Sequence, residues 1–430
     1  MNRIAPTVAL CLLGLAITLQ AQAVEPVGRD DRRDTVEVAR GQPVTGRVVN
    51  PFDQKEVLVL QGGKRVRIPR SRVTSVTTVT DRLRDLLQMH SVMPDEADRL
   101  WILAEWAHSK QLEAMARVFA YRVLCVDPEF ARAHELLGHR KQGEQWLWLR
   151  GDRPMTRKAF DEYVSDFGHP LELSSEHWTL RTDAGLRRAT DTLIDLERAY
   201  LFFMDRFGAK LDAYEVLSPV LVQAWKDADK FPGWTQLHIP YYHPPGTPEG
   251  IYTFFTGDGG RPEALFRTAT EALLNRCVAV DATYPTFEHR LVDWFEIGFG
   301  EWVESQLTGA PGRATSRPPQ MTTERLELVL DTRRYTLPNL LGRNVDDNYY
   351  DSVTDYKDMD WAYTEAFVAF LMSDTTADGN ADKLMRYAFM ALREKKGDSS
   401  SAFDKAFEQR IEKLEKPFEA WLREQVQNKK

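Results

Sequence analysis

Two neighbouring segments with helical spacing of apolar residues constrain the fold of this chain more than any other feature. They cover residues 261–280 and 287–305, and the residues from Asp281 to Pro285 separate them. Apolar residues recur three or four positions apart in both segments, which predicts two helices. The intervening Asp, Tyr and Pro residues are typical of a break between helices. Taken by themselves, the two segments are typical of ordinary core helices.

The beginning of the chain has the layout of a cleavable secretory signal. Residues 1–23 contain the positive Arg3, an apolar run from Val8 to Leu19, and the small residues Ala21 and Ala23. A membrane anchor is the alternative interpretation, but the apolar run is short for a membrane span. We therefore expect an exported protein, periplasmic or secreted, with no membrane span in the mature chain.

Length and charge limit the class of protein and its partners. The 430 residues are 43% hydrophobic and 28% charged, which fits a globular protein of two or three domains. The net charge is -8, and Arg3 is the one charged residue of the signal, so the mature chain is more acidic still. This balance disfavours nucleic acid and anionic membranes as partners. Cys125 and Cys277 could form a disulfide after export, but isolated cysteines are more often simply buried.

Residues 36–80 consist of short alternating runs separated by turn-forming residues. Five runs are divided at Asn50-Pro51, Gly62-Gly63 and Pro69, which predicts a small SH3-like or Sm-like β-barrel. This part is locally basic, with Lys55, Lys64, Arg65, Arg67, Arg70 and Arg72. A polyanion site is one interpretation, and a solvated charged face is the one that we favour.

Residues 81–150 are predicted to form a helical hairpin region similar to a tetratricopeptide unit. Residues 95–108 and 111–125 have the pattern of an antiparallel helix pair, and a third helix ends near Gly138. His134 and His139 are five positions apart, so they do not share a helix face as metal ligands at i and i+4 would. We interpret them as exposed or capping residues. Residues 143–170 show few periodic signals and are predicted to be a connector.

The remaining chain predicts an α+β arrangement followed by helices. Residues 177–183, 214–225 and 251–257 are typical of strands, and a long helix is expected to begin near Gly185. Residues 320–427 contain successive helical patterns and are predicted to form an all-α cap. The overall fold class is therefore α+β.

The paired helices resemble those of a known peptidase family. The first contains Thr270-Glu271-Ala272-Leu273-Leu274 and the second Trp294-Phe295-Glu296-Ile297-Gly298. Both resemble the helices of gluzincin-type zinc peptidases and of the peptidase MA-like domain of secreted bacterial proteins. The family carries His-Glu-x-x-His on the first helix and Trp-Leu-x-Glu-Gly on the second. The resemblance implies a gluzincin-like domain over residues 173–310 and a cleft between it and the helical cap.

The resemblance also implies that the zinc ligands are lost. Thr270 and Leu274 stand at the two histidine positions, Ile297 at the third ligand, and Glu271 at the general base. Leu and Ile cannot donate a lone pair, and a Thr hydroxyl is a poor neutral ligand for zinc. Without the metal, Glu271 has no activated water to deprotonate and is a vestige. The resemblance places further candidate cleft residues at Trp294, Glu296, Glu301 and Tyr363.

Three functions are consistent with the sequence. The preferred one is an exported pseudo-peptidase without a cofactor, which binds a peptide or protein or serves as a scaffold. The alternative is an active metal-dependent hydrolase that holds zinc through His238 and His243 together with Glu271 or Glu296. A purely structural envelope component is the third. Acidic residues around 346–360 could suggest a glycosidase pair or a Ca²⁺ site, but we interpret them as solvated loop residues.

Overall fold

The computed structural model describes most of the chain. The described residues are 33–151, 153–232, 240–243, 250–257, 260–278, 293–308, 323–331, 336–342, 358–393 and 399–429. The signal-like segment 1–23, the break at 281–285, His238 and the acidic residues 346 and 347 lie outside them. The described part has the α+β composition that the sequence predicts.

The N-terminal unit is a five-stranded antiparallel sheet. Its strands, in the order β4-β3-β2-β1-β5, are β1 (Asp34–Val38), β2 (Val44–Val48), β3 (Glu56–Gln61), β4 (Lys64–Pro69) and β5 (Val73–Thr77). Alternate valines such as Val57 and Val59 form its own small core. Gly62 and Gly63 both have positive φ in the turn between β3 and β4, which favours glycine there. Among the described residues no ladder joins β4 to β5, so the sheet is open and does not close into the small barrel that the sequence predicts.

Helices follow the sheet as the sequence predicts. They are α1 (Val79–Val92), α2 (Ala97–Ser109), α3 (Glu113–Val126) and α4 (Ala131–Leu137), with the short η1 (Arg70–Arg72) before them. Thr78 and Asp81 form a reciprocal capping box that begins α1. Because α2 and α3 pack closely along their lengths, the predicted helical hairpin is confirmed.

The segment after α4 differs from its prediction. A three-stranded antiparallel sheet replaces the end of the helical region and the start of the connector: β6 (Arg140–Gln142), β7 (Gln145–Arg150) and β8 (Arg153–Met155), followed by α5 (Arg157–Tyr163). Gly143 and Gly151 have positive φ and provide its turns. Trp146 and Trp148 alternate along β7, a strand signal too short to stand out from the surrounding helical pattern.

The interpretation of His134 and His139 as exposed or capping residues is wrong. Both are buried. Their Nδ1 atoms lie 2.7 Å apart, and Nε2 of His134 lies 2.8 Å from the carbonyl oxygen of Pro128. The Trp146 ring stacks on His134. Aromatic packing against the small sheet therefore removes these imidazoles from water, and burial lowers the pKa of His139 to about 3.

A mixed sheet forms the centre of the molecule. Its order is β12-β13-β11-β10-β9, with β9 (Leu171–Ser174), β10 (Trp178–Thr182), β11 (Val220–Trp225), β12 (Tyr241–His243) and β13 (Gly250–Phe254). The inner pairs β10–β11 and β11–β13 are parallel. The long helix α6 (Leu186–Phe203), extended by η2 (Met204–Gly208), connects β10 to β11. The strand predicted from residue 214 begins only at Val220, after Pro219.

The described part of the chain from Leu265 onward is mainly helical, as predicted. It contains α7 (Leu265–Leu273), η4 (Leu274–Val278), α8 (Asp293–Thr308), α9 (Thr323–Asp331), α10 (Leu337–Gly342), α12 (Asp358–Ser373), α13 (Asn380–Arg393), α14 (Ser399–Phe407), η5 (Ile411–Leu414) and α15 (Glu415–Lys429). The short η3 (Ala228–Lys230) follows β11.

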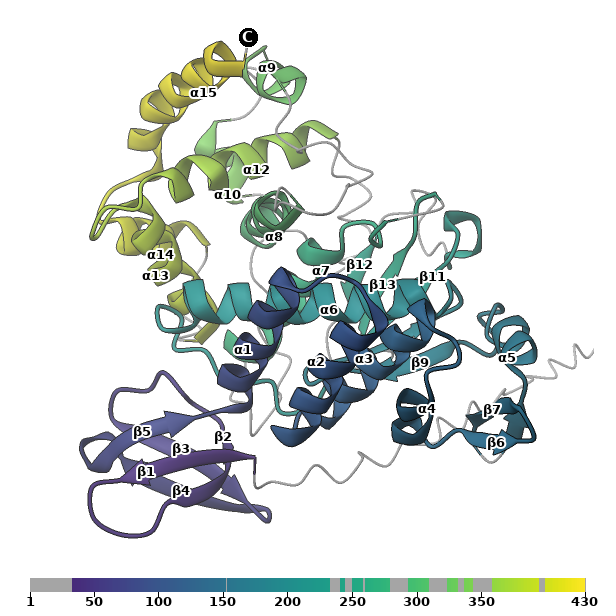
Figure 1. Ribbon diagram of the computed structural model, residues 1–430. Coiled ribbons are helices and arrows are strands. Elements are labelled where there is room, and N and C mark those ends of the chain that lie inside the picture. Colours follow the sequence, from purple (N-terminus) through teal and green to yellow (C-terminus); the bar gives the residue numbers. More distant parts are fainter. Residues whose placement is uncertain are drawn as a thin grey trace, which may run out of the picture.

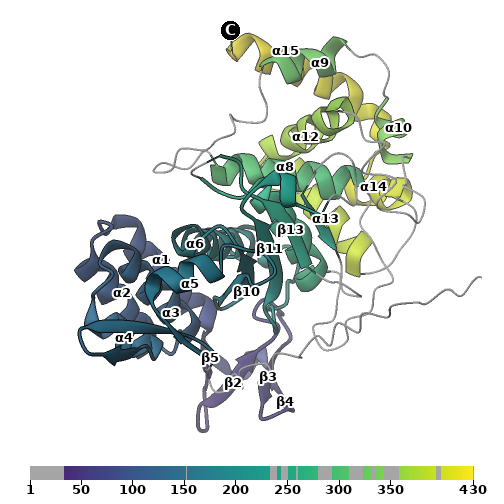
Figure 2. The ribbon, with the colours of Figure 1, turned by 90° about the vertical axis from the view of Figure 1, so that its right-hand side faces the viewer.

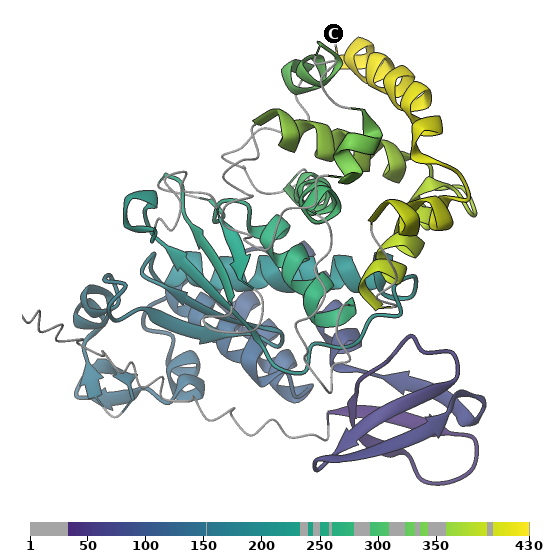
Figure 3. The same cartoon turned by 180° about the vertical axis from the view of Figure 1, so that it is seen from behind.

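The views place these parts relative to one another. Helices α8 to α15 lie on one side of α6 and the central sheet, and the N-terminal sheet lies on the opposite side (Figures 1 and 2). The view from behind shows the same arrangement (Figure 3). One large hydrophobic core extends from α1 to α15. None of the described helices combines the length and apolar character needed to cross a membrane. Cys125 and Cys277 do not form a disulfide.

Candidate functional site

Helices α7 and α8 pack as antiparallel neighbours. At one end, the backbone N–H groups of Phe266 and Arg267 donate to Glu304 over 2.6 and 2.9 Å. At the other end, Nδ2 of Asn275 donates to Oε1 of Glu296 over 3.1 Å. The first part of α7 therefore faces the last part of α8, and Ile297 lies near the level of the end of α7.

Two glycines allow α8 to approach its neighbours closely. A Cβ on Gly298 would lie 2.6 Å from the carbonyl oxygen of Thr364 in α12. A Cβ on Gly300 would lie 2.8 Å from Cγ of Arg267 in α7. Both distances are shorter than van der Waals contact, so any larger residue at these positions would push α8 away from α7 or α12. The glycine pattern of this segment is thus a packing requirement.

The three aligned ligand positions are filled by packing. The Thr270 hydroxyl donates to the carbonyl oxygen of Phe266, 2.7 Å away and one turn earlier on the same helix. Leu274 is 0% exposed and Ile297 is 6% exposed. No side chain at these positions directs a metal-binding atom into the space between the helices.

Glu271 is held by a neighbouring cation. Its side chain is buried, and its Oε1 lies 2.7 Å from Nη1 of Arg267, one turn earlier on α7. Burial raises the pKa of Glu271 to about 6, although the Arg267 cation opposes this shift. Arg267 also donates to the carbonyl oxygen of Pro240 over 2.6 Å and lies 3.3 Å from Oε1 of Glu301. A guanidinium group therefore neutralises the carboxylate at the aligned general-base position.

Glu304 lies in the same buried cluster. It accepts the two backbone N–H groups described above, which lower its pKa, but burial is the larger effect and raises the pKa to about 7. Glu301, one helical turn earlier, adds a like charge that raises it further. The space between α7 and α8 therefore holds several carboxyl groups close to Arg267, and burial favours the protonated form of Glu304.

The other candidate cleft residues are also buried. Trp294, Glu296, Glu301 and Tyr363 all lie in the interior. Trp294 is in ring contact with Phe367, Tyr387 and Phe403 of the C-terminal helices. These four residues therefore join the helices to each other, and the cleft itself remains a prediction.

The alternative zinc ligands are only partly described. His243 ends β12, where it pairs with Gly250 of β13, and it is half-buried. His238 lies outside the described residues. In the part of the chain that the structure describes, no three His, Cys, Asp or Glu side chains are grouped so as to hold a metal ion.

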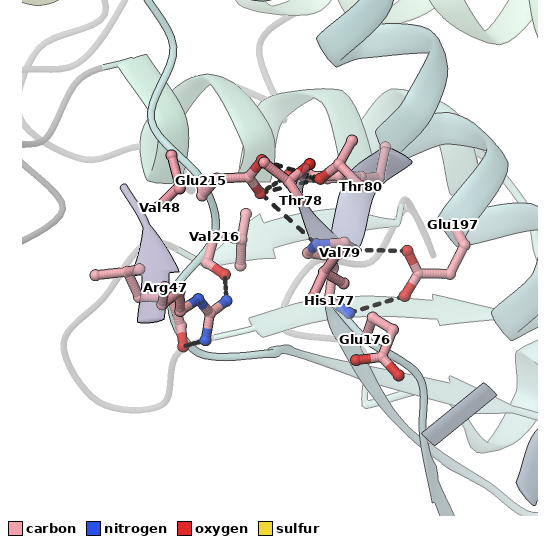
Figure 4. Close-up of polar contacts among 12 residues, drawn as sticks. Arg47, Val48, Thr78, Val79, Thr80, Glu176, His177, Glu197, Glu215 and Val216 are labelled. Carbon is pink, nitrogen blue, oxygen red and sulfur yellow. Dashed lines mark hydrogen bonds and ion pairs between the residues drawn. The ribbon is translucent and has the colours of Figure 1, made fainter. Parts of the chain in front are cut away.

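A second buried polar cluster, which we call the junction cluster, joins the N-terminal sheet and α1 to the central domain, by which we mean the mixed sheet and α6. It consists of Thr80, His177, Glu197, Tyr200 and Glu215. Glu197 accepts hydrogen bonds from the backbone N–H of His177 at 2.8 Å, and it lies 2.7 Å from Nδ1 of the same residue. The other imidazole nitrogen lies 3.9 Å from Glu215. Figure 4 shows His177 directed at Glu197, and Thr80 directed at Glu215.

The junction cluster is linked to the N-terminal sheet by further contacts. Tyr200 stacks on His177 and donates its hydroxyl to Glu215. The backbone N–H of Glu215 donates to the carbonyl oxygen of Val49 over 2.8 Å. Arg47 donates to the carbonyl oxygen of Leu217 and to that of Val216, the second of which Figure 4 shows. These bonds connect β2 to the loop before β11, so the sheet is attached firmly to the central domain.

Burial also affects the acids of this interface. Asp34 accepts the backbone N–H groups of Val48 and Val79 at 2.8 and 2.7 Å. Burial nevertheless raises the pKa of Asp34 to about 6. Glu197 shows the opposite balance. Burial raises its pKa, but its interactions with His177 and Ser175 together lower the pKa below the ordinary value of a glutamate.

Sequence reasoning did not identify Arg267, His177 or Glu197. A signal existed for two of them. Arg267 precedes Glu271 by four positions on a helix, the spacing of an ion pair. Glu197 follows Leu193 by four and precedes Tyr200 by three, so it lies on the apolar stripe of α6. His177 carried no comparable signal, because its partners come from distant elements.

A search of protein-family models and of curated proteins finds no significant match to this chain.

Proposed function

We propose that this chain is an exported pseudo-peptidase that binds a peptide or protein, or acts as a scaffold, in the cell envelope. The observation that carries the proposal is the pairing of Glu271 with Arg267, next to ligand positions filled by Thr270, Leu274 and Ile297. A general base must reach a water molecule that a metal has acidified. Glu271 is 1% exposed and already pairs with a guanidinium group. It is thus suited to a structural role.

The finer fold assignments form part of the same proposal. They are a gluzincin-like domain over residues 173–310 and a helical cap over 320–427, with a ligand-binding cleft between the two. The firm attachment of the N-terminal sheet through the junction cluster supports a scaffold, because such a role needs a fixed geometry between binding surfaces. Export rests on the signal-like residues 1–23. We expect no nucleic-acid partner.

The test combines metal content, cleavage and binding on the same preparation. The mature protein is purified without chelators, and its zinc is measured by elemental analysis. A labelled unfolded polypeptide without net charge serves as the probe for both hydrolysis and fluorescence anisotropy. We expect no stoichiometric zinc, no hydrolysis, and saturable binding.

Two variants make the result decisive. Glu271→Gln removes the aligned general base, and Glu135→Gln changes an exposed glutamate on α4 as the matched control. Stoichiometric zinc together with hydrolysis that Glu271→Gln abolishes and Glu135→Gln leaves intact would reject the proposal. Absence of both hydrolysis and binding would reject its binding part and favour a structural component.

A further inference from the structure

Strand β4 forms one edge of the N-terminal sheet. It pairs with β3 on one side, and among the described residues no strand pairs with its other side. In Figures 1 and 2, β4 lies on the side of the molecule turned away from the C-terminal helices. The structure describes the chain continuously from residue 33 to 151, so the whole sheet is defined.

The register shows which backbone groups face this outer edge. Antiparallel pairs alternate between residues that exchange hydrogen bonds and residues that do not. Because Gly62 and Gly63 form a two-residue turn, the flanking residues Gln61 and Lys64 exchange backbone hydrogen bonds. The N–H of Arg70 donates to the carbonyl oxygen of Lys55 at the other end of the pair, an even number of residues away, which agrees with this alternation. Arg67 faces Leu58, whose carbonyl oxygen accepts from Val49 of the chain next to β2. The N–H and C=O of Arg67 therefore point away from β3.

The same strand presents positive side chains. Lys64, Arg65 and Arg67 are exposed, whereas Ile68 faces the core. The Arg67 side chain is 66% exposed and lies 3.2 Å from Glu56, a surface pair that contributes little stability. Residues 36–80 contain eight basic and three acidic residues, although the whole chain carries a net charge of -8. The edge is thus a local positive surface on an acidic protein.

These two features select the partner. An edge strand with outward backbone groups pairs with an extended polypeptide, and main-chain hydrogen bonds give such pairing its affinity. Positive side chains on the edge repel a second copy of the same edge, which disfavours pairing between two molecules of this protein. An extended acidic segment can form hydrogen bonds with the outward backbone groups of β4, and its carboxylates can pair with the positive side chains of the strand.

We propose that β4 binds an extended acidic polypeptide segment by adding it as a further strand of the N-terminal sheet, with Arg67 as the central contact. Pro69 limits the paired length, because it has no N–H to donate. This inference goes beyond the proposed function, since it concerns another surface and holds whether or not the central helices bind a ligand.

The test measures binding of a labelled peptide of alternating Glu and Thr to the mature protein by fluorescence anisotropy. A second peptide carries N-methyl groups on alternate backbone nitrogens, which block strand pairing and leave the charge unchanged. We expect the first peptide to bind, the methylated peptide to bind much more weakly, and salt to weaken the binding. Equal binding of the two peptides would show a general polyanion surface and overturn the proposal, as would no binding of either.

Three variants separate backbone from charge. Arg67→Ala removes the charge and keeps the N–H, and we expect the dissociation constant to rise about fivefold. Arg67→Pro also removes the outward N–H without affecting the ladder to β3, so it should weaken binding clearly more. Arg140→Ala on the exposed strand β6 is the control and should bind like the unchanged protein. If Arg67→Pro, shown to be folded by circular dichroism, binds no more weakly than Arg67→Ala, strand pairing is excluded.

Discussion

Arg267 and Glu271 face each other one helical turn apart in an interior that excludes water. Removing both charges from water costs free energy that their attraction repays only in part, so such a pair adds little net stability. Removing one partner is different, because the other charge is then buried alone. Replacing Arg267 or Glu271 alone is therefore expected to cost more stability than replacing both.

The first prediction concerns this pair. We expect Arg267→Met to lower the free energy of unfolding by about 3–5 kcal/mol, because Glu271 and Glu301 lose their buried cation. The double variant Arg267→Met/Glu271→Met should regain a large part of that loss. Urea denaturation of both variants and of Glu271→Met completes the double-mutant cycle.

Arg423 and Glu419 provide the control for this cycle. They have the same spacing of four residues on α15, but both side chains are exposed. Arg423→Met should change stability by less than about 1 kcal/mol. Similar losses for Arg267→Met and Arg423→Met would show that burial does not determine the energetics of the central pair.

At the scale of elements, the packing of α7, α8 and α12 depends on glycine. The second prediction is that Gly298→Ala destabilises the protein by about 1–3 kcal/mol, because the new methyl group meets the backbone of Thr364. Gly168→Ala is the control, since its Cβ would meet the end of the Asp166 side chain, which can move. Thermal unfolding of both variants measures the difference. Equal effects would contradict a close approach of α8 to α12.

The third prediction tests whether the helix pair retains the geometry of a zinc peptidase. The triple variant Thr270→His, Leu274→His, Ile297→Glu restores a His-Glu-x-x-His segment and a third ligand on α8. We expect it to bind one zinc ion, because histidines at i and i+4 and a facing carboxylate suit that metal. Elemental analysis after dialysis gives the stoichiometry.

A partial variant shows whether α8 contributes. Thr270→His/Leu274→His lacks the third ligand and should retain zinc less tightly than the triple variant. A folded triple variant that holds no zinc would contradict the resemblance of the two helices to the gluzincin pair, and the pseudo-peptidase proposal would lose its basis.

At the scale of the whole molecule, several buried acids make stability depend on pH. Asp34, Glu271 and Glu304 have pKa values raised by burial to about 6, 6 and 7. Each therefore binds its proton more tightly in the folded state than in the unfolded state. The stability that these protonated acids contribute is fully present below the pKa values that they have in the unfolded chain. It is lost as pH rises through their folded-state pKa values of about 6 to 7.

The fourth prediction concerns this loss of stability with rising pH. We expect the melting temperature to fall between about pH 5 and about pH 8 as these acids ionise in the interior. Glu197, whose pKa is lowered, acts in the opposite direction, and its contribution is lost only at acidic pH, as pH falls through its folded-state pKa. Glu304→Gln, which mimics the protonated acid, should reduce the slope, and Glu135→Gln should leave it unchanged. A melting temperature that rises over this range would contradict the prediction.

Local patterns in the sequence determined the elements whose signals are complete within a short segment. Alternating valines and paired glycines specify the N-terminal strands, and apolar stripes specify α2, α3 and α6, because strand and helix periods are properties of consecutive residues. The same patterns predicted the helix pair, whereas the assignment of substituted ligand positions on it rests on the resemblance to gluzincins and stays a prediction. They failed at β6 to β8, where the strands are too short to show a period, and at the start of β11.

Only the tertiary structure decided what the buried polar residues contact. His177 gains Glu197 and Glu215 from two other elements, and Glu304 gains backbone donors from α7. Such partners meet only when distant segments pack, so no spacing in the sequence encodes them. Burial decided the rest: the ionisation of Asp34, Glu271 and Glu304 depends on how far packing removes them from water, which is a property of the folded molecule and not of neighbouring residues.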